Sequence, residues 1–171
     1  MDGVGNMEWA SIQDWMCEPI ITQKTGKTIK EHQSLSVQSY LDLVSIAPEI
    51  PWAPVLQGQS PDSYVEHIGM YVDAGVNLWS APACGVGSVC RRQAMDEAVE
   101  IFRRLHDEWG LKNLHGFGVK KQGLRRAHQY LKSADSMAWS FAGRMLDGKS
   151  ANSLEFATKW RSDVVSSIGW S

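Results

Sequence analysis

The stretch Ser133-Ala134-Asp135-Ser136-Met137-Ala138-Trp139-Ser140 decides how we interpret the fold of this chain. An acid stands at the end of a short, mostly apolar segment, and a helix is expected directly after it. In parallel α/β proteins, catalytic side chains are presented at the carboxyl ends of strands. Four other segments end in the same way, at Asp14, at Gln57, at residues 82–87 and at residues 115–118. The sequence therefore predicts one site on the rim of a barrel.

Strands and helices are expected to alternate along the chain. The apolar patterns predict strands over residues 10–17, 51–56, 76–80, 114–119 and 133–138. Helices are expected over 28–46, 60–75, 88–110, 124–131, 141–146 and 153–168. The first begins at a Thr28/Glu31 capping box, and the second begins at Ser60-Pro61. This order predicts βαβ units and a parallel sheet.

About five βα units are fewer than the eight of a closed barrel. We expect an α/β fold of the partial TIM-type (β/α) barrel kind whose N-terminal strands lie elsewhere; an open α/β fold is the alternative. The expected organisation is a single domain over residues 1–171, with a barrel-like core at about 8–147 and a C-terminal helix at about 153–168.

Composition excludes several classes of protein. The chain has 171 residues, of which 43% are hydrophobic and 21% charged, the balance of a globular protein. A net charge of -2 gives no global basic field for nucleic acid, so any such contact needs a local patch. No apolar run reaches the ~18 residues of a membrane span, and we expect no membrane partner. Three cysteines without a tight pattern, and a start unlike a signal peptide, favour a cytoplasmic location.

Five motifs carry a family resemblance. They are DWMCEP (14–19), PWAPVLQG (51–58), GVGSVCRR (85–92), LHGFGVK (114–120) and ADSMAWS (134–140). In this order, over about residues 8–145, they resemble the tRNA-guanine transglycosylase superfamily. The closer similarity is to its DNA-acting branch, the deazapurine DNA modification proteins of phages and bacteria.

The resemblance implies an enzyme that exchanges guanine in DNA for a 7-deazaguanine, either 7-cyano-7-deazaguanine (preQ0) or a close derivative. Asp135 matches the family nucleophile, which attacks C1′ and holds the sugar as a covalent ester. Asp14 matches a carboxylate that binds the purine N1–H and exocyclic amine. Gln57 matches a glutamine at the carbonyl edge of the base.

Further site residues follow from the same resemblance. Backbone groups of Ala83, Cys84 and Gly85 fall where relatives bind the base, and His115 falls where a side chain stacks on it. Arg144 matches an arginine that engages the nucleic-acid backbone. Arg91 and Arg92 are a second candidate phosphate contact, with a solvated basic face as the alternative.

The chain also departs from the family pattern. An upstream motif that supplies a further carboxylate is absent from the sequence, and Cys17, Cys84 and Cys90 do not form a close ligand set. We therefore expect no cofactor and no zinc. A homodimer, or a second chain that supplies the missing strands, would cover the open sheet edge.

Other interpretations of the same residues remain open. Asp135 could be a helix N-cap, Gln57 could belong to a turn, and Cys84 and Cys90 could be buried thiols. The whole chain could be a truncated or non-catalytic barrel subunit that pairs with another chain. An unrelated barrel enzyme would need a lysine or metal ligands at strand ends, and Lys120 is the only lysine placed there.

Overall fold

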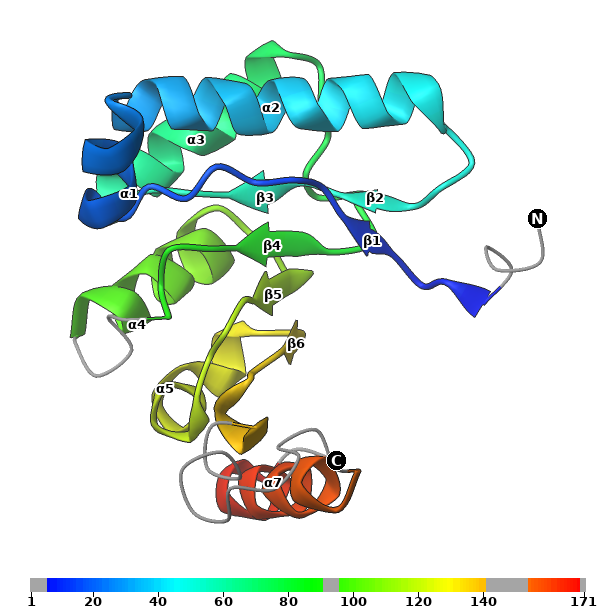
Figure 1. Cartoon of the computed structure of the whole chain (residues 1–171), viewed down its shortest axis with the longest axis vertical. Coiled ribbons are helices and arrows are strands. Elements are labelled where there is room, and N and C mark those ends of the chain that lie inside the picture. The colour runs from blue at the N-terminus through cyan, green and yellow to red at the C-terminus, as the bar shows by residue number, and fades with distance from the viewer. Residues whose placement is uncertain (1–5, 91–95, 141–153, 170–171) are drawn as a thin grey trace.

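The computed structural model describes residues 6–90, 96–140 and 154–169. Its strands form two parallel sheets (Figure 1). One pairs β1 (Ala10–Ser11) with β2 (Trp52–Ala53). The other has the sequential order β3 (Val55–Leu56), β4 (Cys84–Val86), β5 (Leu114–Gly116) and β6 (Ser133–Ala134). The parallel βα organisation predicted from sequence is therefore confirmed, and no closed barrel occurs among the described residues.

A proline separates the two sheets. The expected strand over 51–56 occurs as two short pieces, β2 and β3, on either side of Pro54. Proline has no N–H to give to a ladder, so a strand is interrupted there. Its carbonyl still accepts a hydrogen bond from Gly85 N at 2.8 Å, which ties β3 to β4.

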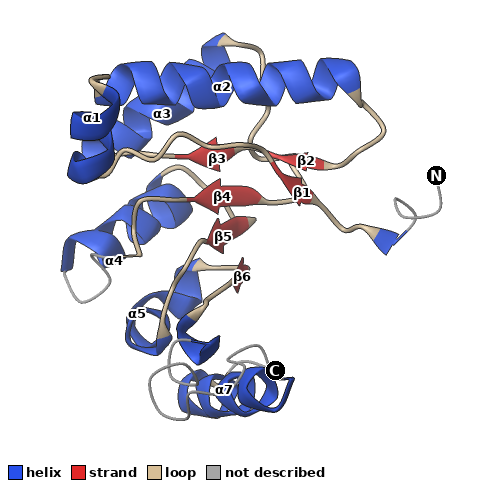
Figure 2. Cartoon of the chain, viewed as in Figure 1, coloured by secondary structure: helices blue, strands red, loops and turns tan. Residues whose placement is uncertain are grey.

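Helices connect β1 to β2, β3 to β4, β4 to β5 and β5 to β6, and a further helix follows β6 (Figure 2). They are α1 (Pro19–Thr25), α2 (Ile29–Ile46), α3 (Pro61–Asp73), α4 (Asp96–Arg103), α5 (Lys121–Ala127) and α7 (Leu154–Ile168). A π-helical segment, η2 (Arg104–Glu108), and a 3₁₀ turn, η3 (His128–Tyr130), extend α4 and α5. Helix α7 packs beside α5 at the β6 end of the sheet, far from α2 (Figure 1).

The expected helix starts are confirmed at two positions. The Thr28 hydroxyl accepts from Glu31 N while the Glu31 carboxylate accepts from Thr28 N, a reciprocal capping box. Ser60 and Ser63 cap α3 in the same way, with Pro61 in the first turn. Helix α1 was not predicted, although Pro19 at its start and Gly26, at φ 69°, after its end mark it.

The predicted strand over 76–80 is wrong. These residues form a turn in which the Asn77 side chain accepts hydrogen bonds from the N–H groups of Trp79 and Ser80. The Leu78 side chain is buried in the core although its backbone is in a turn. Hydrophobic periodicity alone does not distinguish a buried turn residue from a strand residue. The strand lies later, at Cys84–Val86.

Other predicted bounds were too long. Of the strands expected over 10–17 and 133–138, only Ala10–Ser11 and Ser133–Ala134 pair with a neighbour. The helix expected from Ser88 is described from Asp96 onward, and residues 141–146 lie outside the described residues.

The core lies between the four-stranded sheet and the helices that cover it. Tyr64, Ile68 and Tyr71 of α3, together with Ile101 and Phe102 of α4, are almost completely buried. Burial of each such side chain stabilises the fold by roughly 1.5–3 kcal/mol. This packing fixes the strands, and so their carboxyl ends, in space. No helix in the described part of the chain is both long and apolar enough to cross a membrane.

Candidate active site

The sheet register brings the ends of four strands together. One row of register partners runs across the sheet through Val55, Gly85, His115 and Ser133. Side chains alternate between faces, so the residues two positions later lie on the same face, at the carboxyl edge. Those residues are Gln57, Gly87, Phe117 and Asp135. Two of the predicted site residues, Gln57 and Asp135, therefore share one edge and one face of the sheet.

A hydrogen-bond chain joins Gln57 to Asp14. The fully buried Gln57 donates from Nε2 to Asp14 Oδ2 and accepts at Oε1 from the Ser88 hydroxyl. Ser88 Oγ in turn accepts from Cys17 N at 2.9 Å. The amide of Gln57 is thus occupied at both ends and holds the Asp14 carboxylate in place.

Glycine is required at position 87, directly after β4, because the Gln57 side-chain amide lies against its backbone. A β-carbon at Gly87 would lie 2.1 Å from Gln57 Nε2, closer than any real contact. The Gly87 carbonyl also accepts from the buried Tyr64 hydroxyl at 2.6 Å. The end of β4 is therefore shaped to the Gln57 side chain.

Burial dominates the electrostatics around Asp14. Desolvation raises the pKa of Asp14 above its ordinary value, although hydrogen bonds from its backbone and from Gln57 partly offset this. Burial, and secondarily the charge of Asp14, raises the pKa of the Cys17 thiol to about 12. Cys17 is therefore a neutral thiol at physiological pH. Within residues 6–90, 96–140 and 154–169, no group of three or more His, Cys, Asp or Glu side chains could hold a metal ion.

A cavity of about 270 Å³ opens beside Asp14. Its volume is slightly below the range of about 300 Å³ and upward that is usual for ligand pockets. Its walls come from the segment after β1, the end of β4 and the end of β5; they are Ser11, Asp14, Met16, Glu18, Gly87, Ser88, Cys90, Phe117 and Gly118. The buried Glu18 is a further carboxylate of this cavity, and no role was predicted for it from the sequence.

Gly118 connects this cavity to Asp135. Gly118 lines the cavity, and its N–H donates a hydrogen bond to Asp135 Oδ1 at 2.6 Å. The other carboxylate oxygen, Asp135 Oδ2, lies 3.4 Å from His115 Nε2. Burial raises the pKa of Asp135, but the contacts with His115 and Gly118 outweigh it and hold the pKa below its ordinary value. The Asp135 side chain is 55% exposed. It is therefore an ionised carboxylate that a ligand can reach.

His115 is enclosed rather than open. The residue is 6% exposed, and its ring centroid lies 4.8 Å from that of Trp9 and 4.9 Å from that of Phe117, both edge-on. Its Nδ1 lies 2.8 Å from Ser133 Oγ. A ring enclosed in this way offers little flat surface to a base. The stacking role expected for His115 stays a prediction.

Ala83 precedes β4, and Cys84 and Gly85 are its first two residues, whereas Gly87 follows its end. The N–H groups of Cys84 and Gly85 donate to Asn113 O and Pro54 O at 2.9 and 2.8 Å, so they are used within the sheet. The Cys84 side chain is in the core, where burial raises its thiol pKa to about 12. Backbone contacts from these residues to a base stay a prediction; the cavity wall instead contains Gly87 and Ser88, which directly follow β4.

Three predicted phosphate contacts cannot be placed. Arg91, Arg92 and Arg144 lie outside the described residues.

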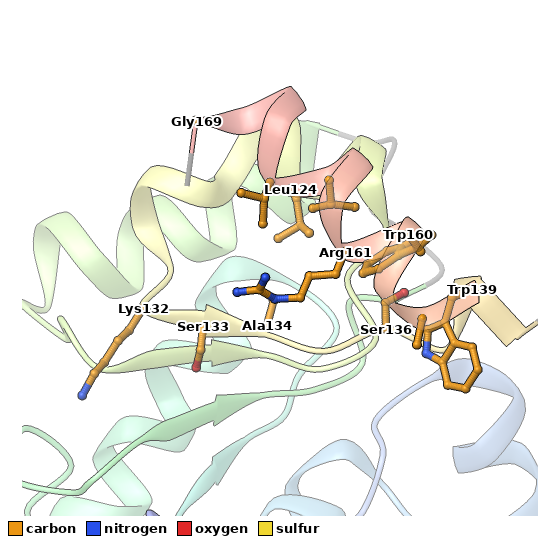
Figure 3. A pocket seen from close by; sticks show the side chains of 12 residues that line it. Leu124, Lys132, Ser133, Ala134, Ser136, Trp139, Trp160, Arg161 and Gly169 are labelled. Atoms are coloured by element: carbon orange, nitrogen blue, oxygen red, sulfur yellow. The ribbon is translucent and has the colours of Figure 1, made fainter. Parts of the chain in front are cut away.

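A second cavity, of about 630 Å³, lies elsewhere, between β6, α5 and α7 (Figure 3). Leu124, Val164 and Trp160 line it, and Arg161 extends into it (Figure 3). Lys132, Ser133, Ala134 and Ser136 also line it, whereas Asp135 does not. None of Asp14, Gln57 and Asp135 lines this cavity, so it is separate from the candidate site.

Comparison with known proteins identifies one match. A family model described as DpdA, DeoxyPurine in DNA protein A, matches residues 1–170. No curated protein and no solved structure matches the chain.

Proposed function

The chain belongs to the DpdA family, DeoxyPurine in DNA protein A, and from this premise we propose that it exchanges guanine in DNA for a 7-deazaguanine, preQ0 or a close derivative. One observation carries the proposal. The accessible, ionised carboxylate of Asp135 accepts a hydrogen bond from the backbone N–H of Gly118. Gly118 and Asp14 both line the same cavity. A nucleophile and a base-recognising carboxylate thus meet at one edge of the sheet.

Asp135 is the nucleophile of the proposed reaction. Its carboxylate oxygen forms a bond to C1′ of the deoxyribose as the bond from C1′ to guanine N9 breaks, through a state with oxocarbenium character. The electron pair of the broken bond stays on guanine, which takes up one proton from solvent and leaves. The sugar is then held on Asp135 as an ester.

The second half of the exchange reverses these steps. N9 of the 7-deazaguanine loses its proton to solvent and attacks C1′, and the Asp135 carboxylate leaves. Two inversions at C1′ retain its configuration, and the proton gained by guanine equals the proton lost by the incoming base. No oxidant or reductant takes part.

Asp14 is the base-recognising group in this proposal. Its two oxygens accept from the adjacent N1–H and exocyclic amine that guanine and 7-deazaguanines share, whereas adenine has no N1–H to give. The bond from Gln57 supports this role because it fixes the direction of the carboxylate without using all of its acceptor capacity. The target nucleotide must leave the base stack to reach the site, as C1′ chemistry within a duplex is blocked.

The test is nucleoside mass spectrometry after incubation of the purified chain with DNA and preQ0. We expect the modified deoxynucleoside from the parent chain and a loss of at least about 1,000-fold for Asp135→Ala and Asp135→Asn. Asp73→Asn, at an exposed position of α3, is the matched control and should modify DNA normally.

Two results would count against the proposal. Equal modification by the Asp135 variants would remove this residue from its role. Unmodified DNA from the parent chain would overturn catalysis by this chain alone and would favour a non-catalytic subunit that needs a partner chain.

A further inference from the structure

We propose that His115 is a positioning residue that holds the Asp135 carboxylate for attack through its Nε2–H, and that Ser133 selects the ring tautomer that makes this possible. The inference rests on the proposed function, in which Asp135 is the nucleophile. It gives His115 a task different from stacking on the base.

Three side chains from two adjacent strands form the chain of contacts. His115 and Ser133 are register partners on β5 and β6, and Asp135 stands two residues after Ser133 on the same face. Ser133 Oγ lies 2.8 Å from His115 Nδ1, and Asp135 Oδ2 lies 3.4 Å from His115 Nε2. The sheet register itself therefore places the imidazole between a hydroxyl and the carboxylate.

The chemistry of the two partners determines the tautomer. An ionised carboxylate only accepts hydrogen bonds, so the ring must donate from Nε2 to Asp135. In a neutral imidazole Nδ1 is then an acceptor, and the Ser133 hydroxyl is the donor that satisfies it. Loss of the Ser133 hydroxyl would free the proton to move to Nδ1, where it no longer serves Asp135.

The surroundings keep the ring in one orientation. Trp9 and Phe117 both contact it edge-on, and Gly85, its other register partner, leaves room for Phe117. A β-carbon at Gly85 would lie 2.4 Å from Phe117 Cε2. Two further charged side chains, Glu8 and Lys132, line a cavity of about 430 Å³ with Trp9 and Ser133.

The two oxygens of Asp135 are held unequally. Oδ1 accepts a short bond of 2.6 Å from Gly118 N, whereas the contact of Oδ2 with His115 is long at 3.4 Å. A weak contact leaves more lone-pair density for bond formation, so we assign Oδ2 to the attack on C1′. Oδ1 then becomes the ester carbonyl oxygen, which Gly118 N already faces.

A set of His115 variants separates positioning from stacking. His115→Gln keeps a donor nitrogen at the distance of Nε2, His115→Asn keeps one only at the distance of Nδ1, and His115→Phe keeps the flat ring alone. We expect kcat to fall about 10- to 100-fold in His115→Phe and His115→Asn with KM for preQ0 unchanged. His115→Gln should retain most activity, and Ser133→Ala should lose about 2- to 10-fold in kcat.

Stacking predicts the opposite pattern. Activity preserved in His115→Phe, or a loss that appears only in the KM for preQ0, would overturn the positioning role. A circular dichroism spectrum that matches the parent shows that a variant with lower activity is still folded.

A measurement without turnover separates this inference from the proposed function. Nitrogen-15 NMR of the imidazole should show the Nε2–H tautomer in the parent and a shift toward Nδ1–H in Ser133→Ala. Carbon-13 titration should show the pKa of Asp135 rising in His115→Phe. An Nδ1–H tautomer in the parent, or an Asp135 titration unchanged by His115→Phe, would overturn the inference even if DNA is modified.

Discussion

The side-chain amide of Gln57 donates a hydrogen bond to the carboxylate of Asp14, a residue 43 positions earlier in the chain. Ser88, at the end of the next strand, holds the same amide from its carbonyl side. Three segments that are far apart in sequence are thus fixed to one another through a single buried amide. The position of the Asp14 carboxylate depends on these two hydrogen bonds, and substitution of Gln57 tests that dependence directly.

Gln57→Leu should lower the free energy of unfolding by about 1–3 kcal/mol. The leucine fills a similar volume but leaves the Ser88 hydroxyl without its acceptor and Asp14 without its donor. Urea denaturation of parent and variant measures the difference. Gln38→Leu, on the exposed side of α2, is the matched control and should change stability by less than about 0.5 kcal/mol. Equal effects of the two variants would contradict the role of the amide.

Gly87→Ala should destabilise the protein, whereas Gly69→Ala should stabilise it. The new methyl at position 87 would collide with the Gln57 amide, while at position 69, within α3, it meets nothing within 4 Å. Alanine at an open helical position gains roughly 0.5–1 kcal/mol over glycine. Thermal melts should therefore show shifts of opposite sign. A Gly87→Ala variant as stable as the parent would mean that Gln57 has room to move.

Several features of the fold could be predicted because they depend on local chemistry. Thr28 with Glu31, and Ser60 with Pro61, are helix starts that a short window of sequence specifies. The error at residues 76–80 has a physical cause: Leu78 is buried by a turn that Asn77 and Asn113 hold from their side chains. In this turn, polar side chains make the hydrogen bonds that a neighbouring strand would otherwise make. The pattern of hydrophobic residues is the same in both cases, so it does not distinguish the turn from a strand.

The site shows the same division. Asp14, Gln57 and Asp135 were expected at strand ends, and the structure brings all three to one edge of the sheet. Ser88 was expected only to begin a helix, and neither it nor Gly118 was assigned a role in the site, because their contacts depend on the register of strands that are distant in sequence. Because β4 was expected at 76–80, the sequence also did not reveal that Gly87, directly after β4, lies beside the cavity rather than Cys84 or Gly85.

Asp14→Asn should stabilise the fold at neutral pH while impairing base exchange. Because burial raises the pKa of Asp14, the folded state binds its proton more tightly than the unfolded state does, and the ionised form lowers stability. This loss disappears as the pH falls below the ordinary aspartate pKa of about 3.9. Urea melts should show the stability gain of the variant at pH 7 shrinking toward pH 4.

The same variant should lose about 10- to 100-fold in kcat/KM, since asparagine cannot accept from two donors of the base at once. Its stability change and its activity change should therefore have opposite signs. A variant that is less stable at pH 7 than at pH 4, relative to the parent, would contradict the assignment of Asp14 as a desolvated carboxylate.

Asp135→Asn should show the reverse dependence on pH. The contacts with His115 and Gly118 lower the pKa of Asp135, so its ionised form contributes stability that is present above the ordinary aspartate pKa and is lost as the pH falls through the lowered value in the fold. The asparagine side chain can offer its oxygen to Gly118 N, but its amide then points donor hydrogens at the Nε2–H of His115. The variant should therefore be less stable than the parent at pH 7, and its stability should approach that of the parent in strongly acidic buffer, as measured by urea melts at both pH values.

Because two donors face each other in Asp135→Asn, the imidazole proton of His115 should also move to Nδ1, which nitrogen-15 NMR detects. A stability difference that is independent of pH, with the tautomer unchanged, would mean that His115 and Asp135 do not interact in solution.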